Sequence, residues 1–139
     1  LNLSFLVSIH VLRIPVELVL FQLFIQHKIP KLMTFNGWNF DIVIGISALL
    51  ILIFQLVKKS KISRRFFVLW NLMGISFLMI IVSLAVLASP LPIQQFAFEQ
   101  PNIAVLAFPY CLLPTCVVPI VFMSHTLLIN NYRTNVDDN

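Results

Sequence analysis

Charged residues are scarce in this sequence: they make up 10% of its 139 residues, whereas hydrophobic residues make up 60%. An average soluble domain has roughly 25% charged residues, and the interior of a domain of this length could not hold so much apolar surface. This composition excludes a soluble fold. The apolar runs are continuous and about 20 residues long, whereas a membrane β-barrel needs short alternating segments. We therefore predict an all-α fold, a polytopic transmembrane helical bundle.

The sequence also lacks the motifs that carry catalysis. It has no Walker sequence, no GxSxG, no HExxH, no paired metal-ligand cluster and no acidic pair. Cys111 and Cys116 are five residues apart and would point about 140° from one another on a helix, which suits neither a local disulfide nor a metal pair. We expect both cysteines to be buried as small hydrophobic residues. The sequence predicts no metal site and favours a protein that is not an enzyme.

Four apolar runs are long enough to cross a bilayer, which takes about 20 residues. They cover approximately residues 3–26, 41–57, 65–89 and 103–130. Because the connections between them are short, residues 1–139 are predicted to form a single transmembrane domain. The chain begins with Leu1 rather than methionine, which is compatible with a fragment of a longer protein.

Positive charge is concentrated in one connection between the predicted helices. Five of the nine basic residues lie in the segment KKSKISRR, residues 58–65, whereas the loops on the other side hold only Lys28 and Lys31. The positive-inside rule therefore predicts a multi-pass protein of the cell inner membrane, with loop 58–65 and the C-terminus in the cytoplasm, in agreement with Arg133 in the tail. The positive charge reflects this topology. We expect the bilayer and other membrane subunits or upstream helices as partners, and no nucleic acid.

The first predicted helix carries ionisable residues near its centre. Arg13 and Glu17 are four residues apart, and His10 precedes Arg13 by three, so the three side chains share one helix face. A single charge at this depth costs roughly 2.5–3.5 kcal/mol, and such residues are usually paired or functional. Two interpretations follow. The residues form a buried ion pair that fixes helix packing, or they line a polar cavity in which Arg13 binds an anionic group or Glu17 carries protons.

The two outer loops provide a second set of candidates. Their amide and carboxylate groups lie on the same, non-cytoplasmic side, among aromatic residues suited to the membrane interface. Asp41 also opens the second predicted helix, where its carboxylate can cap the first turn. We interpret these loops either as a recognition surface or as ordinary interfacial connections. The recognition candidates are Asn36, Asn39, Asp41, Gln95, Glu99 and Asn102.

The fourth predicted helix contains Pro109, Pro114 and Pro119, each of which removes a backbone donor and strains the preceding turn. We expect a kinked helix of the kind that often lines transporter cavities. Further along this helix, His125 raises the question of a haem held with His10, since one histidine from each of two helices can ligate haem iron. Two histidines alone are weak support for haem, and we predict no cofactor.

Three segments together, HVLRIPVELVLFQLFIQ, MTFNGWNFD and QQFAFEQPNIAVLAFPY, resemble a group of small bacterial multi-span membrane proteins that carry no assigned activity. The resemblance implies fold class and location only. From the residues themselves we expect an integral membrane protein that binds or moves a small solute or a proton, or that supports a membrane assembly. The alternative is an intramembrane enzyme that acts on a lipid or isoprenoid at the outer face through the two loops.

Overall fold

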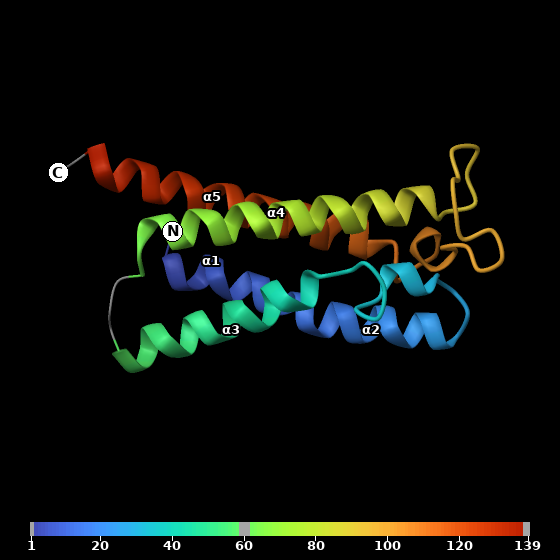
Figure 1. Ribbon diagram of the computed structural model, residues 1–139, viewed down its shortest axis with the longest axis horizontal. Helices are drawn as coiled ribbons and strands as arrows, with labels where there is room; N and C mark the ends of the chain where they lie inside the picture. The colour runs from blue at the N-terminus through green and yellow to red at the C-terminus, as the bar shows by residue number, and fades with distance from the viewer. Residues whose placement is uncertain (1, 59–61, 138–139) are drawn as a thin grey trace.

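The computed structural model describes residues 2–58 and 62–137, and side chains up to residue 131. The regular elements of the described residues are all helices, with no strand among them. The helices lie side by side along the long axis of the molecule (Figure 1). In chain order they are α1 (Leu3–Ile9), η1 (His10–Leu12), α2 (Arg13–Ile25), η2 (Lys31–Met33), α3 (Asp41–Lys58), α4 (Arg64–Leu87), η3 (Ala104–Leu106), η4 (Leu113–Val117) and α5 (Val118–Asp137).

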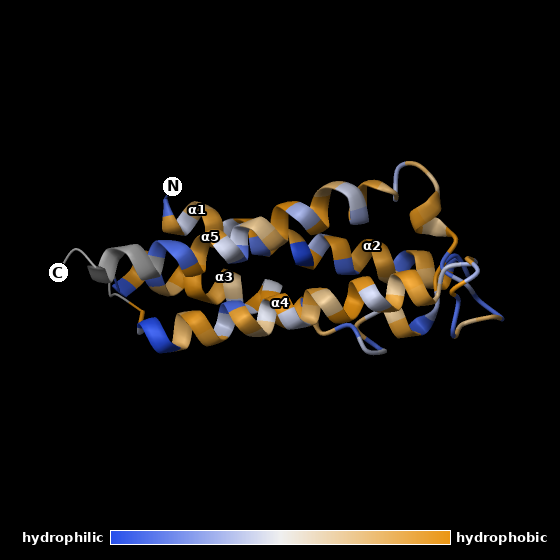
Figure 2. Ribbon diagram, turned by 90° about the horizontal axis from the view of Figure 1, so that it is seen from above, coloured by the Kyte–Doolittle hydropathy of each residue, from blue (hydrophilic) through white to orange (hydrophobic). Residues whose placement is uncertain are grey.

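Four of these stretches are long and apolar enough to cross a membrane: Leu3–Ile25, Asp41–Lys58, Arg64–Leu87 and Leu113–Asn131. Only 22% to 33% of the residues in the apolar window of each stretch are buried inside the molecule. The outer faces of the helices carry exposed large hydrophobic side chains. Figure 2 shows these hydrophobic residues along most of the helical length. The predicted fold class, an all-α bundle of four long apolar helices, is confirmed.

The start of α1, the end of α3, the start of α4 and the end of α5 lie at one end of the bundle, and the end of α2 and the α4–α5 loop lie at the other (Figure 1). We call these two parts the terminal half and the loop half. The topology drawn from loop 58–65 and Arg133 rests partly on residues 59–61, which lie outside the described residues, as does the side chain of Arg133.

The first long helix changes geometry just before Pro15. Because proline has no N–H and its ring crowds the carbonyl four residues earlier, the helix tightens into the 3-10 turn η1. The N–H of His10 therefore bonds to the carbonyl of Val7. The carbonyl of Leu6 instead accepts a hydrogen bond from Ser124 Oγ at 2.8 Å, which ties α5 to α1.

The fourth long helix begins later than predicted. Residues 103–112 contain only the turn η3, and the helix starts with the π-helical turn η4 at Leu113, so the predicted start at residue 103 is wrong. The spaced prolines explain this difference, since each removes a donor and crowds the turn before it. The predicted burial of both cysteines is also wrong: Cys111 is half-buried, Cys116 is exposed, and both are free thiols.

The interior is divided into two apolar clusters by a layer of polar side chains. The core of the terminal half consists of Leu6, Val7, Ile44, Ala48, Ile51, Phe67, Trp70 and Leu128. The core of the loop half consists of Leu20, Leu23, Ile29, Met33, Leu78, Ile81, Ala104 and Val121. The polar layer between them consists of the buried residues His10, Arg13, Asp41, Asn71 and His125.

Candidate functional site

Arg13 is the centre of the polar layer and is only 3% exposed. Its Nη1 donates to Asp41 Oδ1 at 2.6 Å, and this contact is an ion pair. Its Nη2 lies 3.3 Å from the carbonyl oxygen of Gly74, to which it donates, and 3.0 Å from His125 Nε2. The guanidinium thus joins α2 to α3, α4 and α5. Its ion-pair partner comes from α3, so the ion pair expected between Arg13 and Glu17 within one helix is replaced by a pair between helices.

The hydrogen bonds of His125 define its charge. Asn71 Nδ2 donates to the carbonyl of Phe67 at 2.8 Å, so the Asn71 side-chain oxygen faces His125 Nδ1 at 2.7 Å. Nδ1 is therefore the protonated nitrogen, and Nε2 accepts from Arg13. This pattern describes a neutral imidazole. Gly74 makes room for it, since a side chain there would collide with the His125 ring.

His10 lies on the terminal-half side of this network. Its ring stacks on that of His125 with centroids 3.9 Å apart, and it meets the Trp70 ring edge-on at 5.4 Å. Both His10 nitrogens are buried without a hydrogen-bond partner among the described residues. The two imidazoles are in direct contact, and both nitrogens of His125 have hydrogen-bond partners. No group of three or more metal-ligating side chains occurs among the described residues.

Glu17 is 1% exposed and is held by a residue of the loop between α2 and α3. Its Oε1 accepts a hydrogen bond from Asn39 Nδ2. The same amide nitrogen donates to the carbonyl of Met33 at 3.1 Å, and the Asn39 oxygen accepts from the N–H of Asp41 at 3.1 Å. Asn39 thereby fixes both carboxylates relative to the loop. The second oxygen of Glu17, Oε2, has no partner in the part of the chain that the structure describes.

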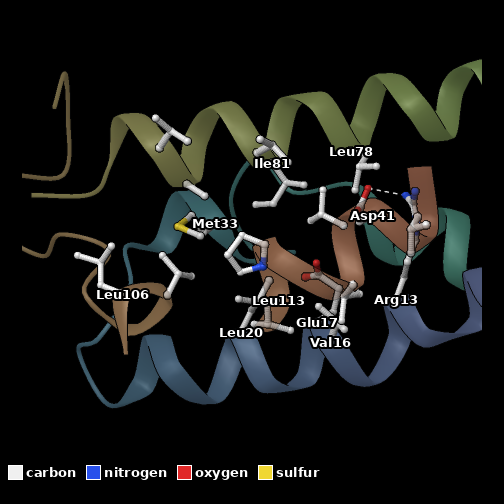
Figure 3. A pocket seen from close by; sticks show the side chains of 18 residues that line it. Arg13, Val16, Glu17, Leu20, Met33, Asp41, Leu78, Ile81, Leu106 and Leu113 are labelled. Atoms are coloured by element: carbon white, nitrogen blue, oxygen red, sulfur yellow. Dashed lines mark hydrogen bonds and ion pairs between the residues drawn. The ribbon is translucent and has the colours of Figure 1, made fainter. Parts of the chain in front are cut away.

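A cavity of about 260 Å³ lies between α2, α4 and the segment that leads into α5. Arg13, Glu17 and Asp41 are at one end, and Glu17 points from α2 into the space below α4 (Figure 3). The other lining residues are apolar. They are Val16, Leu20, Met33, Leu78, Ile81, Val82, Ala85, Val86, Val105, Leu106, Leu113, Pro114, Val117, Val118 and Val121.

The exposed part of the cavity lining is apolar. Val86 is 41% exposed and Leu106 is 57% exposed, and Pro114 is exposed beside them. The opposite end is closed by Arg13 and Asp41. The exposed part of the lining therefore carries no charged group.

The six outer-loop candidates separate into three groups. Asn39 and Asp41 are buried at the cavity end described above. Asn102 is buried too, but its amide donates to the carbonyl of Ala85 at 3.0 Å and fixes its loop to α4. The remaining candidates are exposed: Asn36, Gln95 and Glu99.

Sequence reasoning gave two members of the polar layer other roles. Asp41 was interpreted as a helix cap and a recognition candidate, and His125 only as a haem candidate. Gly74, whose carbonyl and adjacent space are both used, was not among the predicted residues. A buried polar residue on each of the other three long helices was the available signal, because charges in an apolar interior need partners from neighbouring helices.

Comparison with known proteins gives one match. No curated protein and no solved structure matches the chain. A family model described as a domain of unknown function (DUF8737) matches residues 2–132, and the chain therefore belongs to that family.

Proposed function

We propose that this protein is an integral membrane protein that binds a small, mainly apolar molecule inside the bilayer and holds the polar group of that molecule at Glu17. The observation that carries the proposal is the unpartnered carboxylate oxygen of Glu17, at the polar end of a cavity whose remaining walls are apolar. Four long apolar helices and their exposed hydrophobic faces support the membrane location. A bacterial inner-membrane protein with loop 58–65 and the C-terminus in the cytoplasm is the topology we propose.

The size and the lining of the cavity favour a ligand-binding site over a packing defect in the core. An apolar cavity of roughly 150 Å³ is enough to bind benzene, and binding sites are typically apolar with a few convergent polar groups. At about 260 Å³ this cavity holds a larger molecule, such as a ring with a short chain. A buried polar atom without a partner costs about 1–3 kcal/mol, which a ligand with a matching group recovers.

The route of access also favours a ligand that dissolves in the bilayer. The exposed part of the lining, Val86, Leu106 and Pro114, offers no charge. The polar layer closes the other end, so the cavity is a blind site and not a channel. Transport of the bound solute requires this layer to rearrange.

The alternative of an enzyme acting at the outer face receives less support. Asn39 and Asn102 are engaged in hydrogen bonds that hold the loops in place. The exposed candidates, Asn36, Gln95 and Glu99, supply one carboxylate and two amides without a nucleophile. A structural role in an assembly is compatible with solute binding, since the outer faces remain available to other membrane subunits.

A cavity-filling variant tests the proposal. The purified protein in lipid nanodiscs is titrated with phenylbutanol, and its Tm shift and saturable binding are measured. Val117→Trp places a large ring in the cavity and is expected to weaken binding roughly tenfold or more. Met79→Trp, on an exposed face of α4 away from the cavity, is the matched control and leaves binding unchanged. Equal affinity in both variants contradicts the proposal.

A further inference from the structure

We infer that the ligand of this cavity is an organic cation, an amine attached to an apolar body, and that it exchanges with a proton on Glu17. The inference rests on the proposed function and specifies its ligand class. It is carried by the charges that surround the cavity end and by the position of the free oxygen of Glu17.

The first step is the balance of charge in the polar layer. Arg13 and Asp41 neutralise one another in their ion pair at 2.6 Å. His125 is neutral, because it accepts from Arg13 and donates to Asn71. His10 has no acidic partner and stacks on this neutral ring. Ionised Glu17 is therefore the one charge of the described site that has no counter-charge.

The second step is the set of groups that face Glu17 from each neighbouring element. Arg13 precedes it on α2, Asp41 faces it from α3, and Asn39 bonds to it from the loop. The walls from α4 and α5 are apolar, with Leu78, Ile81 and Val121 among their residues. No second cation is present among the described lining residues. A buried carboxylate without a counter-charge is strongly disfavoured, so the site takes up a proton or a cation.

The third step is the geometry of the carboxyl group. Asn39 donates to Oε1, whereas Oε2 has no hydrogen-bond partner among the described residues. One free acceptor oxygen is suited to one charged N–H donor, and such charge-assisted hydrogen bonds are stronger than neutral ones. An anionic ligand would be repelled by the ionised Glu17 carboxylate, because the charge of Arg13 is already balanced by Asp41.

The exchange is balanced in atoms and charge. In the empty site the carboxyl group carries the proton. When a protonated amine enters, the O–H bond of Glu17 breaks, the proton leaves to solvent, and the carboxylate accepts a hydrogen bond from the ammonium group. No other covalent bond changes, and the net charge of the site stays the same. Amine binding therefore releases one proton for each molecule bound, whereas binding of a neutral molecule releases none.

Three probes that share one apolar body test this inference: phenylbutylamine, phenylbutanol and phenylbutyrate. Their binding to the full chain in nanodiscs is measured by calorimetry in two buffers of different ionisation enthalpy, which reports the protons released. We expect the amine to bind roughly tenfold or more tightly than the other two probes. Glu17→Gln, whose amide oxygen can still accept from Asn39, should remove this preference and the proton release while leaving alcohol binding in place. Glu99→Gln, at an exposed loop carboxylate, is the matched control.

The outcomes separate the two proposals. Alcohol or carboxylate binding as tight as amine binding, still weakened by Val117→Trp, overturns the cation inference and leaves the binding site standing. Amine preference that persists in Glu17→Gln, or amine binding without proton release, also overturns it. If none of the probes binds, or if Val117→Trp changes nothing, the proposed function fails together with the inference.

Discussion

The terminal half and the loop half of the bundle are built from the same four long helices but are filled differently. In the terminal half, Phe67 and Leu128 are fully buried, and the hollow of about 510 Å³ there is a more open one between α3 and the start of α4, lined by Ser47, Ile51 and Phe66 among others. In the loop half, the core residues Leu20 and Ile81 line a cavity of about 260 Å³. The difference arises in the fourth long stretch, because α5 packs as a regular helix only after the π-helical turn η4. A segment that proline keeps out of the α-helix leaves space beside its neighbours.

The two halves are expected to contribute differently to stability and to binding. The terminal half contributes most to the stability of the bundle, the loop half provides room for a ligand, and the polar layer lies between them. Variants in the polar layer and in each half test this division.

The largest effect is expected at Arg13. Arg13→Leu leaves Asp41 buried without its cation, and removing one partner of a buried ion pair costs about 3–5 kcal/mol. The double variant Arg13→Leu/Asp41→Leu should recover most of this loss. The free energy of unfolding in detergent measures both. A double variant no more stable than the single one would show that the ion pair is not what Arg13 contributes.

Leucine truncations in the two halves give the next largest difference. Leu6 and Leu20 lie on the same long helix, 2% and 4% exposed, but only Leu20 faces the cavity. Leu6→Ala should cost about 3–4 kcal/mol and Leu20→Ala about 2, because a side chain beside an existing cavity loses fewer contacts. Thermal and denaturant unfolding provide the measurement. Equal losses would argue that the loop half is as tightly filled as the terminal half.

A substitution at Gly74 perturbs the polar layer by steric crowding and leaves its charges unchanged. Gly74→Ala forces the His125 ring to move, and overpacking of this kind costs about 1–3 kcal/mol. The hydrogen bonds of His125 to Arg13 and Asn71 should weaken together, which the imidazole resonances in an NMR spectrum would report. An unchanged spectrum and unchanged stability would show that the His125 ring can adopt another position without losing its hydrogen bonds.

The smallest effects are expected from enlarging an alanine in each half. Ala48 is fully buried in the core of the terminal half, so Ala48→Val should destabilise the protein by about 1–2 kcal/mol. Ala85 lines the cavity, and Ala85→Val should change stability by less than about 0.5 kcal/mol. Melting temperatures of the two variants, compared with the parent, provide the test. A larger loss at Ala85 would contradict this difference between the two halves.

Hydropathy alone was sufficient to predict three of the four long helices closely, because length and apolar composition decide which segments can span a membrane. The start of the fourth was wrong, since hydropathy does not register the donors that proline removes. Helical periodicity predicted that His10, Arg13 and Glu17 share one face; Arg13 and Glu17 line the cavity, whereas His10 is buried outside its lining. It could not reveal that Arg13 pairs with Asp41, because that pairing depends on which helices become neighbours.

The amide of Asn39 has a consequence for observing this protein at work. The Asn39 side chain is hydrogen-bonded to the Glu17 carboxyl group, the Met33 carbonyl and the first turn of α3. A movement of the Glu17 carboxyl group is therefore expected to move the loop that contains Asn39. The next residue toward the N-terminus is Trp38, 62% exposed and one of the two tryptophans of the chain. The indole emission of Trp38 is thus expected to report changes at the buried carboxyl group of Glu17.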